Sequence, residues 1–448
     1  MMGRLLDSVD LTTYRAARPE TSSNSQAFSG RMYDVDPDTG FFPSQPLRPL
    51  SGEFSLWERG LVDARGVLKL GVDRGQEAFA KCALGEQWRQ RLRSWPVVDA
   101  RKLGDKVRTL RRAHYVLTCL LHFYVHSLPS SQVQGQIIIP RPLAVPLVAV
   151  SQKLMLPPIL TFADIVLWNW EFIDPEQPLS LNNMRYVNVF SGTETETNFY
   201  LLSAAAELKG VEMLRIIERV VNVPCPTTQS AIAAIKRDFE ELVRVIDELT
   251  IIIGEASKTV HPNTFYWAAR PWWNGSDAAA PWVFEGVPPS SFDLGGASAG
   301  QSSVMHALDA FLDVDHGLKQ TRQPAPSAEN RRSDTSFMEK MRRYMPEEHR
   351  AYLAQLQKRH VRDLVQRVPA LREHYNMTVA ALKKFRDIHI RIGTLFIISQ
   401  AKSTPPASMG SVEVEGNESR SKGTGGNPVS TLLKAGRDAT QRTLLRDE

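Results

Sequence analysis

The clearest periodic pattern in the chain begins after Thr228 and continues to Ile253. Its apolar side chains recur at alternating spacings of three and four residues, which places them on one face of an α-helix. They are Ile232, Ile235, Phe239, Leu242, Ile246, Leu249 and Ile253. Thr227 and Thr228 are typical of a helix N-terminus. The pattern therefore predicts a helix of several turns that starts at this threonine pair.

Helical character extends over much of the remaining chain. It is found in residues 53–127, 198–221, 337–356, 380–398 and 428–445. Pro346 and the two glutamates after it are typical of the first turn of a helix, because proline needs no N–H partner there. The prolines between residues 140 and 158 instead predict an irregular connection, and a short helix is predicted over 159–170. No alternating β pattern of comparable length is present, so the predicted fold class is all-α.

Composition and charge exclude several classes of protein. The chain has 448 residues, of which 42% are hydrophobic and 23% are charged, as in ordinary globular proteins. Its net charge of +5 is spread along the chain, which favours solvated helix faces over a nucleic-acid site. The three cysteines lie far apart without a CxxC motif, which argues against a disulfide scaffold, a cysteine zinc site and covalent haem attachment.

Neither a signal peptide nor a membrane span is predicted. Asp7 and Asp10 interrupt the N-terminal segment, where a signal peptide needs an unbroken apolar stretch. The most apolar region, residues 137–160, contains Arg141, Lys153 and several prolines, so it cannot cross a bilayer as one helix. We therefore expect a soluble, cytoplasmic protein that binds neither nucleic acid nor a membrane.

Two segments are rich in Ser, Pro, Gly and charged residues and lack periodicity, and we expect both to be mobile. They are residues 319–334 and 401–427. The second ends in a glycine-rich run, Gly423–Gly426, before helical character resumes. A disordered linker and a lid over an active site are both consistent with this pattern.

Most of the ten histidines have structural explanations. Three lie in a helical run that lacks the glutamate of an HExxH zinc motif, and structural roles are predicted for them; they are His114, His122 and His126. Three others lie among charged residues and are predicted to be at the surface; they are His349, His360 and His374.

His389 is different because it occupies an apolar stripe. Leu382, Phe385, His389, Ile392 and Phe396 recur at spacings of three and four, so the histidine lies where leucine would be expected. A buried imidazole costs free energy unless its nitrogens find partners. The residues favour a hydrogen-bonded core histidine. The alternative is an axial ligand of haem iron, with Arg386 one turn earlier reaching a haem propionate.

Two further segments could bind a flat, acidic ligand. Residues 263–275 place Arg270 among large aromatic side chains; a guanidinium can grip a carboxylate, and aromatic faces can stack on a ligand. A packed segment with Arg270 in a salt bridge is equally consistent. Residues 295–303 are small, so that a ligand can approach the backbone closely. They lack the GxGxxG, P-loop and GxSxG spacings.

Taken together, these motifs resemble the indoleamine 2,3-dioxygenase family, and its fungal members most closely. The resemblance extends over nearly the whole chain after about residue 30. The motifs that carry it are Leu156–Leu160, Phe265–Arg270, Ser298–Ser303, Met341–Pro346, the helix with His389, and Gly423–Gly426. Each motif alone is weak, but their order along one chain is specific.

The resemblance implies a two-domain helical fold around one non-covalent haem b. An arm, residues 1–30, would be flexible. A small helical domain, residues 31–190, would cap a larger haem-binding domain, residues 191–448. His389 would be the proximal iron ligand, and Arg386 and residues 298–300 (Ser298, Ala299, Gly300) would contact the haem. The substrate site would comprise Arg270, Phe265, Tyr266, Phe162, Ile165, Phe199, Ser203 and Thr424, with Tyr266 where a second Phe is common.

The implied reaction is cleavage of the indole C2–C3 bond of L-tryptophan by O2. Both oxygen atoms enter N-formylkynurenine, the first product of the kynurenine route toward NAD. The implied partners are L-tryptophan or a related indoleamine, O2 and an unidentified reductant, with the chain acting as a monomer. The alternative is a diverged haem protein that acts on another indole, or that senses haem or a ligand without efficient turnover of tryptophan.

Overall fold

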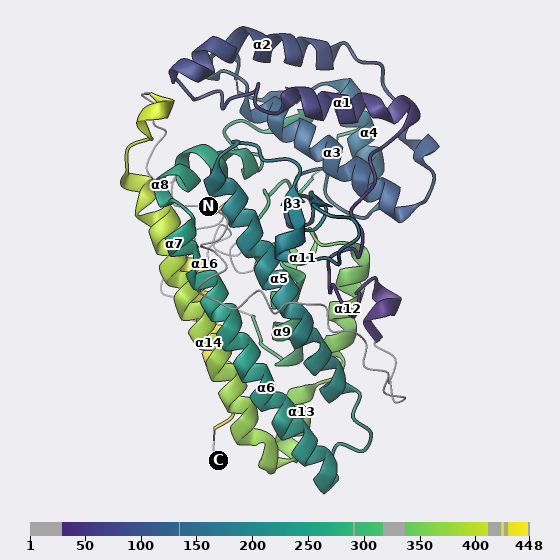
Figure 1. Cartoon of the computed structure of the whole chain (residues 1–448), viewed down its shortest axis with the longest axis vertical. Helices are drawn as coiled ribbons and strands as arrows, with labels where there is room; N and C mark the ends of the chain where they lie inside the picture. The colour runs from purple at the N-terminus through teal and green to yellow at the C-terminus, as the bar shows by residue number, and fades with distance from the viewer. Residues whose placement is uncertain are drawn as a thin grey trace.

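The computed structural model describes residues 29–133, 135–289, 292–316, 337–410, 423–424 and 429–446. The described part of the chain is elongated, and one group of helices covers one end of a longer bundle (Figure 1). The covering helices are α1 (Ser55–Ala64), α2 (Gln76–Arg93), α3 (Val107–His126) and α4 (Arg141–Lys153). The all-α fold class is confirmed. Within the described ranges, no helix combines the length and the apolar character needed to cross a membrane.

The longer bundle is built around four helices. They are α5 (Glu194–Val221), α6 (Gln229–Gly254), α14 (Arg372–Gly393) and α16 (Val429–Thr443). Helix α6 packs against α5 and α14, and α14 also packs against α16. The predicted stripe explains the place of α6, because Ile235 and Leu242 are fully buried in its contacts. Thr228 accepts a hydrogen bond from the backbone N–H of Ala231, so the predicted helix start is confirmed.

Shorter helices complete the bundle. They are α7 (Ala256–Thr259), α8 (Pro262–Thr264), α9 (Ser303–Phe311), α11 (Phe337–Arg342), α12 (Glu347–Gln357) and α13 (Val361–Arg367). Pro346 is the N-cap of α12, with Glu347 and Glu348 in the first turn, so the helix start predicted at Pro346 is confirmed. Helix α9 packs against α5 and α12.

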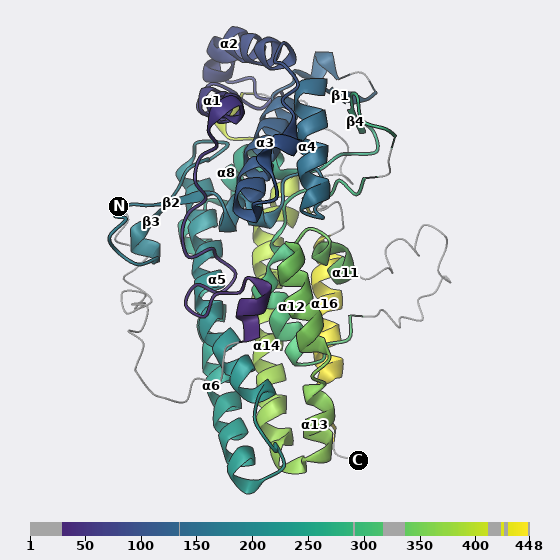
Figure 2. The ribbon, with the colours of Figure 1, turned by 90° about the vertical axis from the view of Figure 1, so that its right-hand side faces the viewer.

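Four short strands form two pairs in the described part of the chain. Strands β2 (Trp170–Phe172) and β3 (Met184–Tyr186) are antiparallel. Strands β1 (Ile137–Ile139) and β4 (Trp282–Phe284) are parallel, with Ile138 opposite Val283. Figure 2 shows this second pair beside α4. Strand β4 thus pairs across the predicted domain boundary near residue 190, and this boundary stays a prediction.

The predicted irregular connection between residues 140 and 158 is wrong, because residues 141–153 form α4. Pro140 is the N-cap and Pro142 lies in the first turn, where a missing N–H breaks no helical hydrogen bond. Pro146 lies inside the helix and does remove one. Burial compensates for that loss, because the apolar face of α4 packs against α3 and is fully buried; it comprises Leu143, Leu147 and Val150.

The surface prediction for His349 is also wrong. Its side chain is only 1% exposed. The ring of Phe41 covers it at a centroid distance of 4.7 Å, and its Nδ1 lies 3.4 Å from Ser303 Oγ. The charged neighbours of His349 in sequence occupy other faces of α12, so their charge did not indicate its burial. His360 is exposed, and His374 is half-buried beside Glu240.

The two segments expected to be mobile fall largely outside the described residues, as does most of the N-terminal arm. Residues 319–334, 411–422, 425–427 and 1–28 are among those not described. Residues 401–410 are described and form short turns. They pack against the N-terminal helices, where the backbone N–H of Arg74 donates to Met409 O over 2.8 Å.

Candidate functional site

An apolar cavity of about 420 Å³ lies among α5, α9, α14 and α16. Cavities of this size hold small molecules and cofactors in other proteins. With the exception of Tyr266, every residue that the sequence assigned to the site lines this cavity. They are Phe162, Ile165, Phe199, Ser203, Phe265, Arg270, Ser298, Ala299, Gly300, Arg386, His389 and Thr424. The fold therefore brings together residues that lie far apart in the sequence.

Three π-helical turns of five residues each reach the cavity wall. They are η7 (Ala163–Leu167), η9 (Phe265–Ala269) and η13 (Thr394–Ile398). The first of them replaces the short helix predicted over residues 159–170. A π-helical turn inserts an extra residue and changes the direction of the side chains around it, and such turns are frequent at functional sites. Each turn contributes cavity-lining side chains, including Ile165, Phe265 and Phe396.

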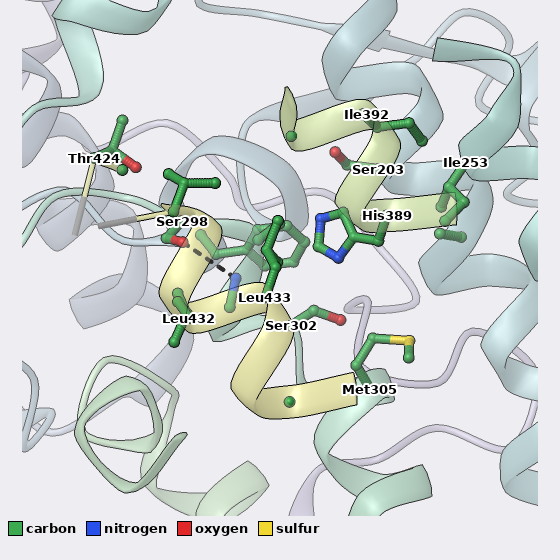
Figure 3. A pocket seen from close by; sticks show the side chains of 18 of the residues that line it. Ser203, Ile253, Ser298, Ser302, Met305, His389, Ile392, Thr424, Leu432 and Leu433 are labelled. Atoms are coloured by element: carbon green, nitrogen blue, oxygen red, sulfur yellow. Dashed lines mark hydrogen bonds between the residues drawn. The ribbon is translucent and has the colours of Figure 1, made fainter. Parts of the chain in front are cut away.

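His389 projects from α14 into the cavity, with Ser203, Ser302 and Met305 around it (Figure 3). Burial, together with nearby Arg386, lowers the pKa of its imidazole to about 4, so the ring is neutral at neutral pH. Among the described residues, no hydrogen bond to either ring nitrogen is found. A neutral imidazole with a free lone pair is suited to bind a metal.

The lining of the cavity fits haem better than a metal ion held by side chains alone. Among the described residues, no group of three or more His, Cys, Asp or Glu side chains is placed to hold a metal ion. Haem needs only one or two axial side chains, because the porphyrin supplies four nitrogen ligands. His389, which lines the apolar cavity and has no hydrogen-bond partner among the described residues, meets this requirement.

Aromatic rings from two segments form one wall of the cavity. The ring of Phe199, on α5, lies 5.0 Å from that of Phe265 and 5.2 Å from that of Trp273. Ser203 lies one turn after Phe199 and donates its hydroxyl proton to the Phe199 carbonyl over 2.9 Å. The Ser203 oxygen keeps its own lone pairs for a ligand. The wall can therefore stack against a flat aromatic group.

Arg270 brings a positive charge to this aromatic wall. It begins η10 (Arg270–Trp273) and is 7% exposed. Its guanidinium carbon lies 5.2 Å from the centroid of the Tyr266 ring, so Tyr266 supports Arg270 from outside the cavity lining. Burial lowers the pKa of Arg270, although a guanidinium stays charged at neutral pH. A buried guanidinium beside an apolar cavity favours a carboxylate ligand.

Residues 298–300 meet Thr424 at the edge of the cavity. Ser298 Oγ accepts a hydrogen bond from the backbone N–H of Gly300 over 3.2 Å (Figure 3). Thr424 donates its hydroxyl proton to Ala297 O, and its carbonyl accepts from the Gly296 N–H over 3.0 Å. A Cβ atom on Gly296 would lie 1.9 Å from Trp273 O, so only glycine fits there. Two distant segments are thereby joined.

Arg386 lines the cavity but already has a carboxylate partner. Its Nη2 lies 2.7 Å from Asp309 Oδ2, and its Nη1 donates to Gly436 O over 2.8 Å. His316 Nε2 lies 2.8 Å from the same Asp309 oxygen. Burial alone would raise the pKa of Asp309, but Arg386 and His316 hold it below its usual range. Contact between Arg386 and a haem propionate stays a prediction.

Two polar side chains hold the backbone segments of the wall in place. His122, on α3, donates from Nδ1 to Trp272 O over 2.7 Å and accepts from the Leu160 N–H at Nε2 over 3.3 Å. Gln301 accepts from the Phe162 N–H over 2.8 Å and donates to Gly296 O over 3.0 Å. The structural role predicted for His122 therefore includes support of the cavity wall.

The sequence did not assign several residues that line the cavity. Trp273, Glu207 and Asp309 are among them. Glu207 lies four residues after Ser203, so helical spacing places both on one face of α5. Burial raises the pKa of Glu207 to about 7, and its carboxylate accepts a hydrogen bond from Ser302. The spacing from Ser203 could have indicated that Glu207 lines the cavity. No comparable spacing indicated this for Asp309.

Comparison with known proteins agrees with this geometry. The model of the family "Indoleamine 2,3-dioxygenase" matches residues 29–443. The chain is 29% identical to indoleamine 2,3-dioxygenase 1 of Rattus norvegicus, over 92% of this chain and 95% of that protein. It is 30% identical to the indoleamine 2,3-dioxygenase of Saccharomyces cerevisiae, over 92% of each. It is 26% identical to a protein named myoglobin from Haliotis madaka, over 92% of this chain and 97% of that protein.

The resemblance predicted from separate motifs is thus confirmed along nearly the whole chain. The family match begins at residue 29 and ends at residue 443, so it includes α5, α9, α14 and α16 together with the cavity among them. His389, Arg270 and the aromatic wall all lie within the matched range. The chain belongs to the indoleamine 2,3-dioxygenase family.

Proposed function

We propose that this chain is a haem-dependent dioxygenase that cleaves the indole C2–C3 bond of L-tryptophan, giving N-formylkynurenine. The observation that carries the proposal is that one apolar cavity is lined by both His389 and Arg270. His389 offers a neutral nitrogen to a metal, and Arg270 offers a buried positive charge to a carboxylate. An amino acid with a flat aromatic side chain matches both this charge and the aromatic wall.

His389 would hold one non-covalent haem b from one side. Residues 298–300 would lie against the edge of the cofactor, and Arg386 would lie near its propionates. When bound, haem supplies the redox-active iron that reaction with O2 requires. The apolar lining would keep bulk water away from this iron. The neutral imidazole of His389 and the apolar lining support this assignment.

The side chains of the wall would bind and orient the substrate. Arg270 would pair with the carboxylate of tryptophan, and Phe199 and Phe265 would contact the indole ring. Such positioning lowers the entropic part of the activation barrier without an acid or a base. Ser203 can accept a hydrogen bond from a bound group, since its own proton goes to Phe199 O. Thr424 would close the site from the glycine-rich segment.

The alternative is a haem protein that binds a ligand or another indole without efficient turnover of tryptophan. One relative carries the name myoglobin, which favours testing this alternative directly. The buried Arg270 beside the aromatic wall supports the dioxygenase, because a protein that only binds O2 needs no grip on a carboxylate. The reductant, a monomeric state and a cytoplasmic location stay predictions from the sequence.

A reconstitution experiment tests the proposal. The full chain is loaded with haem, reduced, and mixed with L-tryptophan and O2, while N-formylkynurenine is followed in the near ultraviolet. We expect a Soret band and growth of product. We also expect Arg270→Ala to retain haem and to lose about 2–3 kcal/mol of transition-state stabilisation in kcat/KM. A Soret band without product in the wild type would support the alternative. No Soret band at all would contradict haem binding.

A further inference from the structure

Trp273 is one of the large aromatic side chains that line the cavity. Its side chain is 2% exposed. Its indole ring is stacked on Phe199 at an interplanar angle of 23°. It also meets the ring of Phe265 at a centroid distance of 5.6 Å and an angle of 61°. Trp273 thus forms part of the aromatic wall together with both phenylalanines.

The indole ring of Trp273 is fixed by a chain of buried hydrogen bonds. Its Nε1–H donates to the Tyr200 hydroxyl oxygen over 2.9 Å, and Tyr200 donates its own proton to Glu196 over 2.6 Å. Glu196 also accepts from the backbone N–H groups of Phe190 and Ser191, over 2.9 and 2.7 Å. Tyr200 and Glu196 are fully buried. Rotation of the indole ring would leave buried polar groups unpaired, which is unfavourable.

Trp273 also has a fixed position relative to Arg270. The two residues are the ends of η10, a 3₁₀-helical turn. Such a turn has three residues, so side chains three positions apart point in the same direction. Arg270 and Trp273 therefore both reach the cavity, while Trp272 between them packs against Phe123 at a centroid distance of 5.3 Å. One short turn thus presents both the positive charge and an aromatic wall at a set separation.

We propose that Trp273 is a specificity-determining residue that limits the size of the aromatic ring of the substrate. This inference rests on the proposed function, because it takes the Arg270 guanidinium as the site of the substrate carboxylate. A substrate whose carboxylate binds Arg270 extends toward the Trp273 ring, which is held in place by its hydrogen bonds. The cavity then accepts an unsubstituted indole and discriminates against indoles with bulky groups on the benzo ring.

The test compares two substrates in the full-length holoprotein. They are L-tryptophan and an L-tryptophan with a methyl group on its benzo ring. Dissociation constants are measured from the shift of the Soret band, and kcat/KM is measured for each. We expect Trp273→Leu to raise the affinity and the kcat/KM for the methylated substrate, each relative to the value for L-tryptophan, by about 10-fold or more. This is the effect expected for one methyl group in an apolar pocket. Tyr200→Phe releases the ring without removing it, so its shift should have the same sign and be smaller.

Trp267→Leu is the matched control. Trp267 is also buried and donates its Nε1–H to Ser403 Oγ over 2.9 Å, but it does not line the cavity. Its substitution should leave the ratio of the two dissociation constants unchanged. An unchanged ratio in Trp273→Leu with a normal Soret band would overturn the proposal. If Trp273→Leu does not fold, Trp273→Phe and Tyr200→Phe supply the same comparison.

The two readouts separate this inference from the proposed function. Absence of turnover of L-tryptophan by the wild type would refute the dioxygenase. The ratio of dissociation constants does not require turnover, so it tests the wall in either case. Equal shifts in Trp267→Leu and Trp273→Leu would show a general loosening of the fold and would also overturn the specificity role.

Discussion

The α9 and α14 regions of the cavity wall each present a histidine, and the two differ in exposure and in hydrogen bonding. His306 is 1% exposed, whereas His389 is half-buried where it lines the cavity. Burial lowers the pKa of both His306 and His389 to about 4. His306, on α9, donates from Nε2 to Gly300 O over 2.9 Å and accepts from Arg342 Nε over 3.1 Å. His389 has no such bonds among the described residues. Burial makes both rings neutral, but only His389 keeps a lone pair for a metal.

The largest effect that the comparison predicts is the loss of haem binding when the His389 side chain is removed. His389→Ala should abolish stoichiometric haem incorporation, because the cavity then offers no axial nitrogen. His306→Gln should keep haem, since its amide can donate to Gly300 O and accept from Arg342. The measurement is the Soret absorbance per chain after reconstitution. A normal Soret band in His389→Ala would show that His389 is not the iron ligand.

A second prediction concerns the stability of the haem-free protein in acid. His306 has a pKa of about 4 in the folded chain, below the ordinary value of 6.5. Between these values the unfolded chain binds the additional proton, so the free energy of unfolding falls as the pH falls from 6.5 toward 4. The contribution of His306 is on the order of 1.4 kcal/mol per pH unit within this window.

Chemical denaturation at several pH values measures this slope. His306→Gln should flatten it by the contribution of one proton, while buried His122 and His349, whose pKa values also lie well below 6.5, continue to act. An identical slope in the wild type and His306→Gln would mean that His306 takes up its proton without unfolding. In that case its hydrogen bonds would not hold it neutral.

The smallest effect on stability and kinetics is expected from substitution of His122, a second histidine whose two ring nitrogens both form hydrogen bonds. His122→Met removes an acceptor for the Leu160 N–H and a donor to Trp272 O, both of which are buried. The free energy of unfolding should fall by about 1–3 kcal/mol. Since these bonds support the wall, the KM for L-tryptophan should rise more than kcat falls. Unchanged kinetics in a folded variant would show that His122 acts only on stability.

The regular helices were predictable because their patterns are local. The apolar stripe of α6 could be predicted from the sequence because the spacing of apolar residues indicates which helix face is buried. The N-cap Thr228 could be predicted because threonine is typical of a helix start. Helix α4 could not, because its prolines suggested a break, and burial against α3 outweighed the hydrogen bond that Pro146 removes. His349 was misassigned for a related reason. Its cover, Phe41, lies some 300 residues away in the sequence.

The site was predictable as a set of residues, but its internal arrangement was not. The stripe of α14 placed His389 on the apolar face of the helix, and resemblance to a family gave its role. Sequence could not show that His306 has two hydrogen-bond partners whereas none is found for His389 among the described residues, because the partners of His306 belong to other elements. The same holds for Trp273, whose shared direction with Arg270 depends on a 3₁₀ turn. The π-helical turns that aim Ile165 and Phe265 leave no readable periodicity.

The parallel pairing of β1 with β4 has a consequence for synthesis of the chain. Strand β1 ends at Ile139, and its partner starts at Trp282. During translation, the edge of β1 is therefore unpaired until residue 284 has left the ribosome. Closure of such long loops is slow compared with formation of local helices. The N-terminal helices also lack one of their contacts until Met409 has been synthesised, because the carbonyl of Met409 accepts a hydrogen bond from the N–H of Arg74. Strand β1 and the N-terminal helices thus gain these contacts only after the segments that carry their partners have been synthesised.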